Sequence, residues 1–428
     1  MLLILFFLTF LMMTVGRYSG RISLLSLVFY MFFLSYLFYF FPEGSTLILA
    51  NGLLRLDSSL LFSLLFMGAI LFIIVSRSNN LGWEFHLMLF GGYTGAIYMI
   101  LGYDWLISLI GFEFLNLSTY LILSLYRGTE SATLKYLLMS AFFTTLLLLS
   151  ISLFYGLTGS TAFDSLYASM NYLEDSLTLW PQLLLLLTLS FKLGLVPVHL
   201  WVPDVYDGLP MELVLWIGTL PKLAILFFLP VLHPLLINVN QYFLLGGVLS
   251  FILAAISLGA QYRLKRFLAF SAIGHMGIMI TGFAIGDYHS FWFYTLIYFV
   301  ASVNLFLILA ELPGIDLMKR LSLITNNYPL AFAFMIALLT MAAVPPFSGF
   351  YAKLLVLFGL IDIRYMVVAT LLILTSLRTA AYYLRLLQTT FFGPFVASLG
   401  TSELRVSYAT LIAVTTTCLL PTTQLLLL

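Results

Sequence analysis

The chain has 428 residues, of which 62% are hydrophobic and only 8% are charged. A soluble domain carries about 25% charged residues, so a soluble fold could not cover its core with so few charges. The net charge of +1 gives no basis for nucleic-acid binding, and one cysteine, Cys418, can form neither an internal disulfide nor a cysteine metal cluster. These values predict an all-α integral membrane protein.

Apolar runs between charged residues, prolines and glycines predict about fourteen transmembrane helices, because about 20 apolar residues span a bilayer. The first run lacks a positively charged start, so we expect a first helix and not a cleaved targeting segment. The longest predicted connections are 159–179 and 312–327. The predicted helices cover residues 1–15, 21–41, 58–76, 84–102, 105–126, 132–157, 180–200, 209–232, 241–262, 266–286, 289–311, 328–359, 366–388 and 404–427.

Lysine and arginine are distributed unequally between the connections. We number the connections along the chain, so that the first connection joins the first and second predicted helices. The even-numbered connections hold only two cations, Arg55 and Arg364. By the positive-inside rule, the odd-numbered connections face the matrix or cytoplasm, and both termini face the opposite side. The odd-numbered connections and their flanks hold Arg17, Arg21, Arg77, Arg127, Lys135, Arg263, Lys265, Arg266, Lys319, Arg320, Arg385 and Arg405.

Three lysines lie deep within predicted helices and close to prolines. Lys192 precedes Pro197, Lys222 follows Pro221, and Lys353 follows Pro345 and Pro346. Broken helices at membrane depth are tolerated where they are buried in protein or line a cavity, and a desolvated lysine can gain and lose a proton. The pattern therefore predicts ion sites near the middle of the membrane. The alternative for each lysine is a side chain that extends to the membrane surface without a function.

Other polar residues within apolar segments are further candidates. Glu113 can pair with a lysine, or it can be a protonated carboxyl that only stabilises packing. His275 can relay protons, and His199 is similar but nearer a helix end; a packed, hydrogen-bonded histidine is the alternative for both. Arg378 can pair with a carboxylate or only hold a helix in place, because arginine stays protonated. The Gly91 to Gly95 spacing is adequately explained by helix packing.

The positions of the lysines also predict internal symmetry. Lys192 and Lys353 lie in the seventh and twelfth predicted helices, and an offset of five helices inverts the second copy. Little side-chain identity joins the two halves, so this inference rests on layout. We expect one polytopic domain, 1–428, made of three N-terminal helices (1–76), two inverted five-helix repeats (helices 4–8 at 84–232 and 9–13 at 241–388, with helices 7 and 12 broken), and a C-terminal helix (404–428).

Nucleotide and metal motifs are missing from the sequence. It contains no G-x-G-x-x-G fingerprint, no Walker loop, no H-E-x-x-H and no cysteine cluster. We therefore expect no NADH, flavin, iron–sulfur or metal site in this chain.

Four segments resemble the antiporter-like membrane subunits of respiratory complex I. They are FKLGLVPVHLWVPDVYDGLP with IGTLPKLA beyond it, GFEFLNLSTYLIL, LKYLLMSAFFTTLLLLSISLFYGLTGS and PPFSGFYAKLLVL. The resemblance runs from about Asp57 to the end of the chain. It implies that Glu113 and Lys192 form the fifth- and seventh-helix pair, that Lys222 is the eighth-helix lysine, and that Lys353 is the twelfth-helix residue of the distal half-channel.

Two features favour the subunit 2 branch of this family. The subunit 4 branch carries a glutamate where this sequence has Lys353, and the subunit 5 branch has a long C-terminal lateral helix that we do not expect here. Subunit 2 of many animals lacks the first three helices, so their expected presence disfavours an animal source. The high phenylalanine and tyrosine content resembles an organelle-encoded chain.

The resemblance implies proton translocation driven by quinone reduction elsewhere in NADH:ubiquinone oxidoreductase. The relay residues would be Glu113, Lys192, Lys222, His275 and Lys353, with His199 and Arg378 as possible accessories. NADH, flavin, iron–sulfur and quinone would bind other subunits. Expected partners are subunit 4, the small membrane subunits and lipids, in the mitochondrial inner membrane or, alternatively, a bacterial or plastid membrane. Other functions left open are a cation/proton antiporter, a membrane-bound hydrogenase subunit, and a scaffold without transport.

Overall fold

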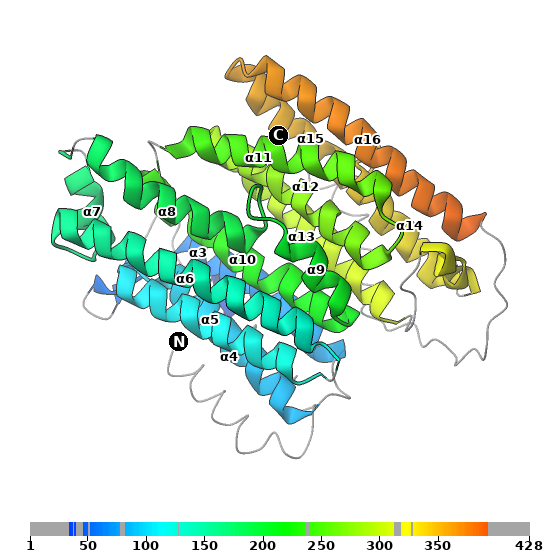
Figure 1. Ribbon diagram of the computed structural model, residues 1–428, viewed down its shortest axis with the longest axis horizontal. Helices are drawn as coiled ribbons and strands as arrows, with labels where there is room; N and C mark the ends of the chain where they lie inside the picture. The colour runs from blue at the N-terminus through cyan, green and yellow to red at the C-terminus, as the bar shows by residue number, and fades with distance from the viewer. Residues whose placement is uncertain are drawn as a thin grey trace. The chain divides into compact units, whose positions relative to one another are not determined.

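The computed structural model describes residues 52–77, 82–126, 128–170, 172–173, 175–236, 239–311, 318–326 and 328–392, with short stretches at 34–36, 38–39 and 46–49. These residues are mostly helical (Figure 1). Within them, nine helices are long and apolar enough to cross a membrane. The helices predicted at 1–15 and 404–427, and most of the one at 21–41, lie outside the described residues, so the count of fourteen stays a prediction.

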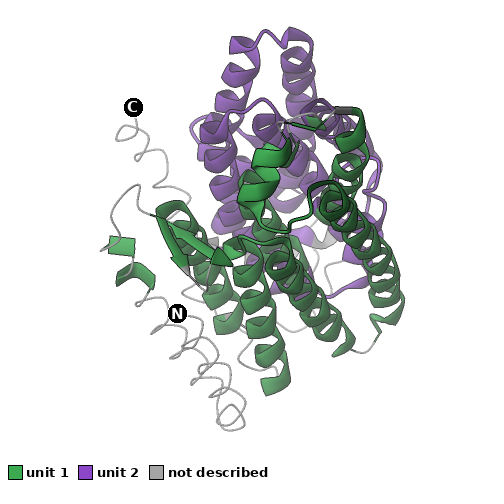
Figure 2. Cartoon of the chain, turned by 90° about the vertical axis from the view of Figure 1, so that its left-hand side faces the viewer, with its two compact units in different colours: residues 1–192, 216–239 green, residues 193–215, 240–428 purple. Residues whose placement is uncertain are grey.

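The chain divides into two compact units, which Figure 2 draws in different colours. Unit 1 comprises residues 1–192 and 216–239, and unit 2 comprises residues 193–215 and 240–428. The segment 193–215 therefore belongs to unit 2, although both of its neighbours along the sequence belong to unit 1.

The long helices of unit 1 coincide with the predicted apolar runs. Two elements were not predicted: an antiparallel hairpin in which Thr46 pairs with Asp57, and a short helix inside the connection 159–179. The elements are β1 (Thr46–Leu49), β2 (Leu54–Asp57), α3 (Ser58–Arg77), α4 (Trp83–Leu101), α5 (Trp105–Ser124), α6 (Glu130–Thr158), α7 (Phe163–Met170), α8 (Asp175–Leu193) and most of α10 (Met211–Leu236).

Asp104 fixes the start of α5 and the path of the chain before α7. Its carboxylate accepts a hydrogen bond from the Leu106 backbone N–H at 2.8 Å, which satisfies one of the free amides at the helix start. The Thr161 hydroxyl donates to the same carboxylate at 2.7 Å. At the end of α6, Gly159 has a positive φ of 72°, a usual helix stop. The connection predicted at 159–179 is therefore ordered around the N-terminus of α5.

Helices α4 and α5 approach each other closely at Gly95, as they also do at Gly111, which faces Met99. A Cβ at Gly95 would lie 2.6 Å from the backbone nitrogen of Leu115 and 2.8 Å from the carbonyl oxygen of Gly111. At Gly91, one turn earlier, the nearest atom would be 3.8 Å away. Only one of the two glycines of the G-x-x-x-G pattern therefore allows close helix packing.

Helix α12 is the central helix of unit 2 and packs against α9, α11, α13 and α15. In the most apolar 18-residue stretch of α12, 89% of the residues are buried, whereas the corresponding share in α16 is 17%. Helix α16 therefore lies at the periphery of this unit. The helices are α9 (Trp201–Gly208), α11 (Asn240–Ser257), α12 (Leu264–Ala284), α13 (Tyr288–Ala310), α14 (Tyr328–Ala342), α15 (Ser348–Asp362) and α16 (Met366–Phe391), with 3₁₀ helices η3 (Leu258–Ala260) and η4 (Met318–Asn326).

Both predicted helix interruptions are present. Pro197 lies between α8 and α9, and Pro345 and Pro346 lie between α14 and α15. Proline removes a backbone donor and clashes with the preceding turn, which favours a helix end at both places. The Val196–Pro197 and Pro345–Pro346 peptide bonds are both cis. Lys192 lies in the last turn of α8, and Lys353 lies near the start of α15, so each of these lysines adjoins an interruption.

Candidate functional site

In unit 1, Lys192 is almost completely buried and is held by two neutral acceptors. Its Nζ donates to Oδ1 of Asn116 on α5 and to Oγ of Ser140 on α6, both at 2.6 Å. The Tyr120 hydroxyl donates to the same serine oxygen at 2.6 Å. Asn116 and Ser140 have no exposed surface, whereas Lys192 is 5% exposed. These bonds satisfy an ammonium group inside an apolar core.

Aromatic rings complete the surroundings of the Lys192 ammonium. The ring centres of Phe112, Tyr136 and Phe191 lie 5.2, 5.5 and 5.8 Å from Nζ. A cation within about 6 Å of a ring centre is attracted to the face of the ring. The site can therefore hold a positive charge without a contacting carboxylate.

Glu113, the expected partner of Lys192, is half-buried on α5. Among the ion pairs of the described residues, none joins Glu113 to Lys192. Asn116 and Tyr120 were missed as candidates, although they follow Glu113 at i+3 and i+7 and therefore share its helix face. That spacing is a sequence signal that could have identified both residues.

Lys222 is the most deeply buried of the three lysines, with 1% of its surface exposed. It lies inside α10 directly after Pro221, and α10 continues past this proline. Lys222 therefore differs from Lys192 and Lys353, because its helix is not interrupted beside it.

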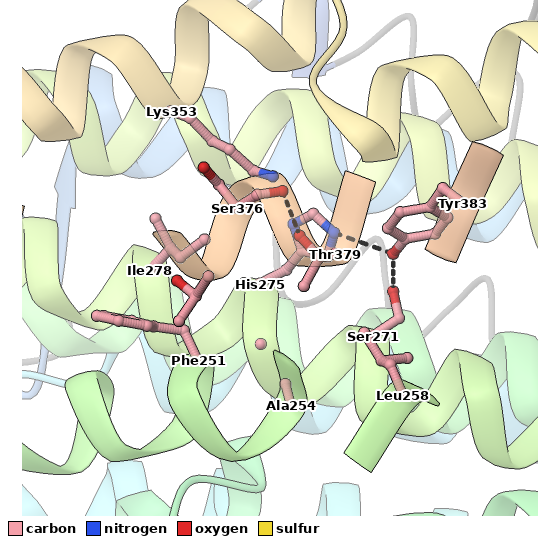
Figure 3. A pocket seen from close by; sticks show the side chains of 12 residues that line it. Phe251, Ala254, Leu258, Ser271, His275, Ile278, Lys353, Ser376, Thr379 and Tyr383 are labelled. Carbon is pink, nitrogen blue, oxygen red and sulfur yellow. Dashed lines mark hydrogen bonds between the residues drawn. The ribbon is translucent and has the colours of Figure 1, made fainter. Parts of the chain in front are cut away.

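In unit 2, Lys353 and His275 line two adjoining cavities. One is bounded by α11, α12, α15 and α16 and has about 20 Å³ of water-accessible space, and the other has about 10 Å³. A cavity needs roughly 10–15 Å³ of such space to hold one water molecule. Figure 3 shows the Lys353 and His275 side chains pointing into the first cavity. One water molecule could therefore join these two titratable groups.

Tyrosine hydroxyl groups contact both ring nitrogens of His275. Nδ1 lies 2.8 Å from the hydroxyl of Tyr294, and Nε2 lies 3.3 Å from the hydroxyl of Tyr383. The ring of Tyr298 lies 5.0 Å from the imidazole, centre to centre. These tyrosines are on α13 and α16, far from His275 along the chain, so no local pattern in the sequence points to them.

The two accessory candidates lie apart from the His275 cavities. His199 is buried between α8 and α9, and its Nδ1 has no hydrogen-bond partner in the part of the chain that the structure describes. Arg378 is exposed on α16 and donates to the Tyr382 hydroxyl at 3.1 Å. Among the described residues, neither residue lines the cavities that hold Lys353.

No group of three or more His, Cys, Asp or Glu side chains that could hold a metal ion occurs among the residues that the structure describes. An amine, an amide and hydroxyl groups converge in unit 1, and an amine, an imidazole and hydroxyl groups converge in unit 2. These groups can accept, hold and pass on protons.

Buried titratable groups beside interrupted transmembrane helices characterise one class of membrane protein. The family model for NADH:quinone oxidoreductase/Mrp antiporter transmembrane proteins matches residues 102–379. That range includes Glu113, Lys192, Lys222, His275 and Lys353.

Individual relatives define the branch of this class. NADH-ubiquinone oxidoreductase chain 2 of Hyaloraphidium curvatum is 55% identical over 431 residues, covering 100% of both chains. NADH-quinone oxidoreductase subunit N of Hydrogenovibrio crunogenus is 32% identical over 330 residues, covering 73% of this chain and 69% of its own length. A chain of respiratory complex I from Thermus thermophilus has the same fold, with a TM-score of 0.86 at 27% identity, covering 99% of this chain and 97% of that one. The chain belongs to the family of NADH-ubiquinone oxidoreductase chain 2.

Proposed function

We propose that this chain is a core membrane subunit of NADH:ubiquinone oxidoreductase and that it translocates protons. The energy comes from quinone reduction in other subunits, which also bind NADH, flavin and the iron–sulfur clusters. Within this chain, the proton relay consists of Glu113, Lys192 and Lys222 in unit 1 and of His275 and Lys353 in unit 2, with His199 and Arg378 as possible accessories.

The observation that carries the proposal is the burial of three lysines in membrane helices. Lys192, Lys222 and Lys353 are 5%, 1% and 7% exposed. A charged side chain at the centre of a bilayer costs about 2.5–3.5 kcal/mol or more, and a scaffold protein gains nothing from three such residues. A proton relay needs titratable groups at this depth.

The arrangement around Lys192 supports its role as an exchange site. Hydrogen bonds from the ammonium to Asn116 and Ser140 stabilise its charged form. A neutral amine can instead accept a hydrogen bond from the Ser140 hydroxyl, to which Tyr120 donates, or a proton from water. Because the acceptors are neutral, the ammonium is not fixed by a full negative charge. A change of charge at Glu113, on the same face of α5 as Asn116, alters the electrostatic potential at this site.

The function is tested with Lys192→Ala in the assembled complex, reconstituted in vesicles. We expect the complex to assemble while proton pumping and coupled quinone reduction fall together. Lys192→Arg should not restore pumping, because arginine keeps its proton. The matched control is Thr188→Val, one turn earlier on α8, where the hydroxyl donates only to its own helix at Leu185. Normal pumping by assembled Lys192→Ala would refute the relay.

The orientation in the membrane is part of the same proposal. We place the chain in the mitochondrial inner membrane, with the odd-numbered connections in the matrix and both termini in the intermembrane space. Subunit 4, the small membrane subunits and lipids surround it. A tag at the C-terminus that is cleaved by protease only from the matrix side would contradict this orientation.

The inverted repeats at 84–232 and 241–388 are also part of the proposal. They are supported by the interruption next to Lys192 and the corresponding interruption next to Lys353. In an experimental structure of the complex, the two ranges should superpose by a two-fold axis in the membrane plane.

A further inference from the structure

A row of hydroxyl groups runs along the face of α16 that borders the His275 cavity. Ser376, Thr379 and Tyr383 follow one another at i, i+3 and i+7, so they share one side of the helix. All three line the cavity together with Lys353 and His275 (Figure 3). Seven residues of helix span about 10 Å, so the row extends well beyond the lysine.

Tyr383 connects His275 to a second residue of α12. Its hydroxyl lies 3.3 Å from Nε2 of His275 and is also hydrogen-bonded to the hydroxyl of Ser271. Tyr383 is 1% exposed and Ser271 is 6% exposed. His275 and Ser271 are four residues apart on one face of α12, about 6 Å along the helix axis, and the tyrosine hydroxyl bridges that interval.

This connection leads toward a defined end of unit 2. Ser271 lies between His275 and the start of α12, and the start is about 10 Å from Ser271 along the axis. Arg263, Lys265 and Arg266 cluster at this start. By the positive-inside rule, this end faces the matrix.

Apolar side chains separate Ser271 from that surface. Leu258, the first residue of η3, lines the cavity near this point. The ring of Phe267 packs edge-on against Tyr383 at 5.5 Å. Leu258 and Phe267 are 3% and 2% exposed, so we infer that a water molecule that approaches Ser271 from the start of α12 must pass these two side chains. A pump needs such a seal, because an open path would let protons leak.

We propose that Ser271 and Tyr383 form the proton-uptake branch of unit 2 and link His275 to the aqueous side at which α12 begins. This inference rests on the proposed function. It adds two proton-conducting residues and a direction of entry to the relay.

Each step of this branch conserves protons. The Tyr383 hydroxyl gives its proton to Nε2 of neutral His275 and takes one from the Ser271 hydroxyl, which in turn takes one from an entering water. The hydroxide left by that water is neutralised by a proton from the aqueous side, so that one proton is taken up in all. Nε2 must be the free acceptor, which requires that Nδ1–H donates to the Tyr294 oxygen at 2.8 Å. The imidazolium then passes a proton to the neutral amine of Lys353 through the shared cavity, and both hydroxyls stay neutral throughout.

The test compares Tyr383→Phe with Tyr382→Phe in the assembled complex in vesicles. The substitutions are identical and adjacent, but Tyr382 contacts Arg378 and does not line the cavity. We expect Tyr383→Phe to slow quinone-coupled pumping by roughly tenfold or more and to increase the solvent deuterium isotope effect. Tyr382→Phe should match the unsubstituted complex. Equal rates and equal isotope effects in the two variants would overturn the proposal.

Ser271 provides a second test that does not depend on the folding of the tyrosine variant. Ser271→Ala removes the hydroxyl and should slow pumping, whereas Ser271→Thr keeps the hydroxyl and should restore it. If both variants pump alike, Ser271 does not conduct protons.

The Lys353→Ala variant distinguishes a failure of the uptake branch from a failure of the proposed relay. If Lys353→Ala stops pumping while the Tyr383 and Ser271 variants pump normally, only the uptake branch is wrong; if Lys353→Ala also pumps normally, the relay itself is wrong.

The direction of entry is tested by chemical labelling. Ser271→Cys is made in a Cys418→Ser background, which removes the single native cysteine of this chain. During turnover, a small membrane-impermeant thiol reagent should label position 271 from the matrix side. Labelling only from the intermembrane-space side, or from neither side, would overturn the assigned direction.

Discussion

Replacing Gly95 by alanine should force α4 and α5 apart at a place where their backbones are in direct contact. The new Cβ would lie 2.6 Å from the Leu115 nitrogen, and ordinary contacts begin at 3.4 Å. The atoms that it meets are backbone, so no side chain can rotate away. The two helices must therefore separate locally by about 1 Å.

The energetic cost follows from a comparison with Gly91. Overpacking a well-packed interface costs about 1–3 kcal/mol. Alanine also has a higher helix propensity than glycine by about 1 kcal/mol, but this gain applies equally at Gly91 on the same helix. A Cβ at Gly91 would meet its nearest atom at 3.8 Å. Gly95→Ala should therefore be less stable than Gly91→Ala by about 1–3 kcal/mol.

The displacement should also affect Lys192. Asn116 directly follows Leu115 on α5, and its Oδ1 accepts the lysine hydrogen bond at 2.6 Å. A local displacement of about 1 Å at Leu115 exceeds the roughly 0.5 Å range of ordinary hydrogen-bond lengths, so it should distort this bond. We therefore expect Gly95→Ala to reduce proton pumping even in the complexes that assemble.

The assay heats membranes that carry each variant and measures the intact complex that remains on native gels, together with pumping at a permissive temperature. Gly95→Ala should lose intact complex at a lower temperature than Gly91→Ala. If the two variants lose it at the same temperature and pump equally, the close approach of α4 and α5 does not constrain this site.

Two further predictions concern polar contacts, one set in unit 1 and the other in unit 2. Asn116→Leu removes an acceptor from a charged donor, an interaction of about 1.5–3 kcal/mol, so pumping should fall; Ser118→Ala, whose hydroxyl bonds only within α5, should pump normally, and equal rates would remove Asn116 from the site. Asp207→Asn weakens contacts to Arg263 at 2.6 Å and Arg266 at 3.0 Å, which hold α9 to α12. The arginines are 62% and 43% exposed, so we expect a loss of only about 1 kcal/mol in heat stability, and less at high salt. Asp204→Asn should weaken the attachment to Arg266 less than Asp207→Asn does, because the Asp204–Arg266 ion pair is 3.5 Å long, and a larger loss of salt-sensitive heat stability in this variant would contradict the assignment.

The sequence by itself determined the helical framework and its interruptions. An apolar run that spans a bilayer must satisfy its backbone hydrogen bonds internally, and a helix does so within one segment. The predicted runs therefore coincide with the long helices that the structure describes. Proline cannot donate a backbone hydrogen bond, so the breaks near Pro197 and Pro345 were also predictable, although the same signal at Pro221 does not end α10. The same reasoning selected Lys192, Lys222 and Lys353, because a lysine in an apolar run is costly wherever the run packs.

Tertiary structure alone decided which groups these residues contact. Lys192 donates to residues 76 and 52 positions away in the sequence, and no ion pair with Glu113 is among those described. Tyr383 reaches His275 across 108 positions, whereas Arg378, in an equally apolar segment, is exposed. The helices of this chain are apolar almost all round, so hydrophobic periodicity does not say which face meets which neighbour. The facing side chains follow only from how the helices pack, and packing depends on close approaches such as the one at Gly95.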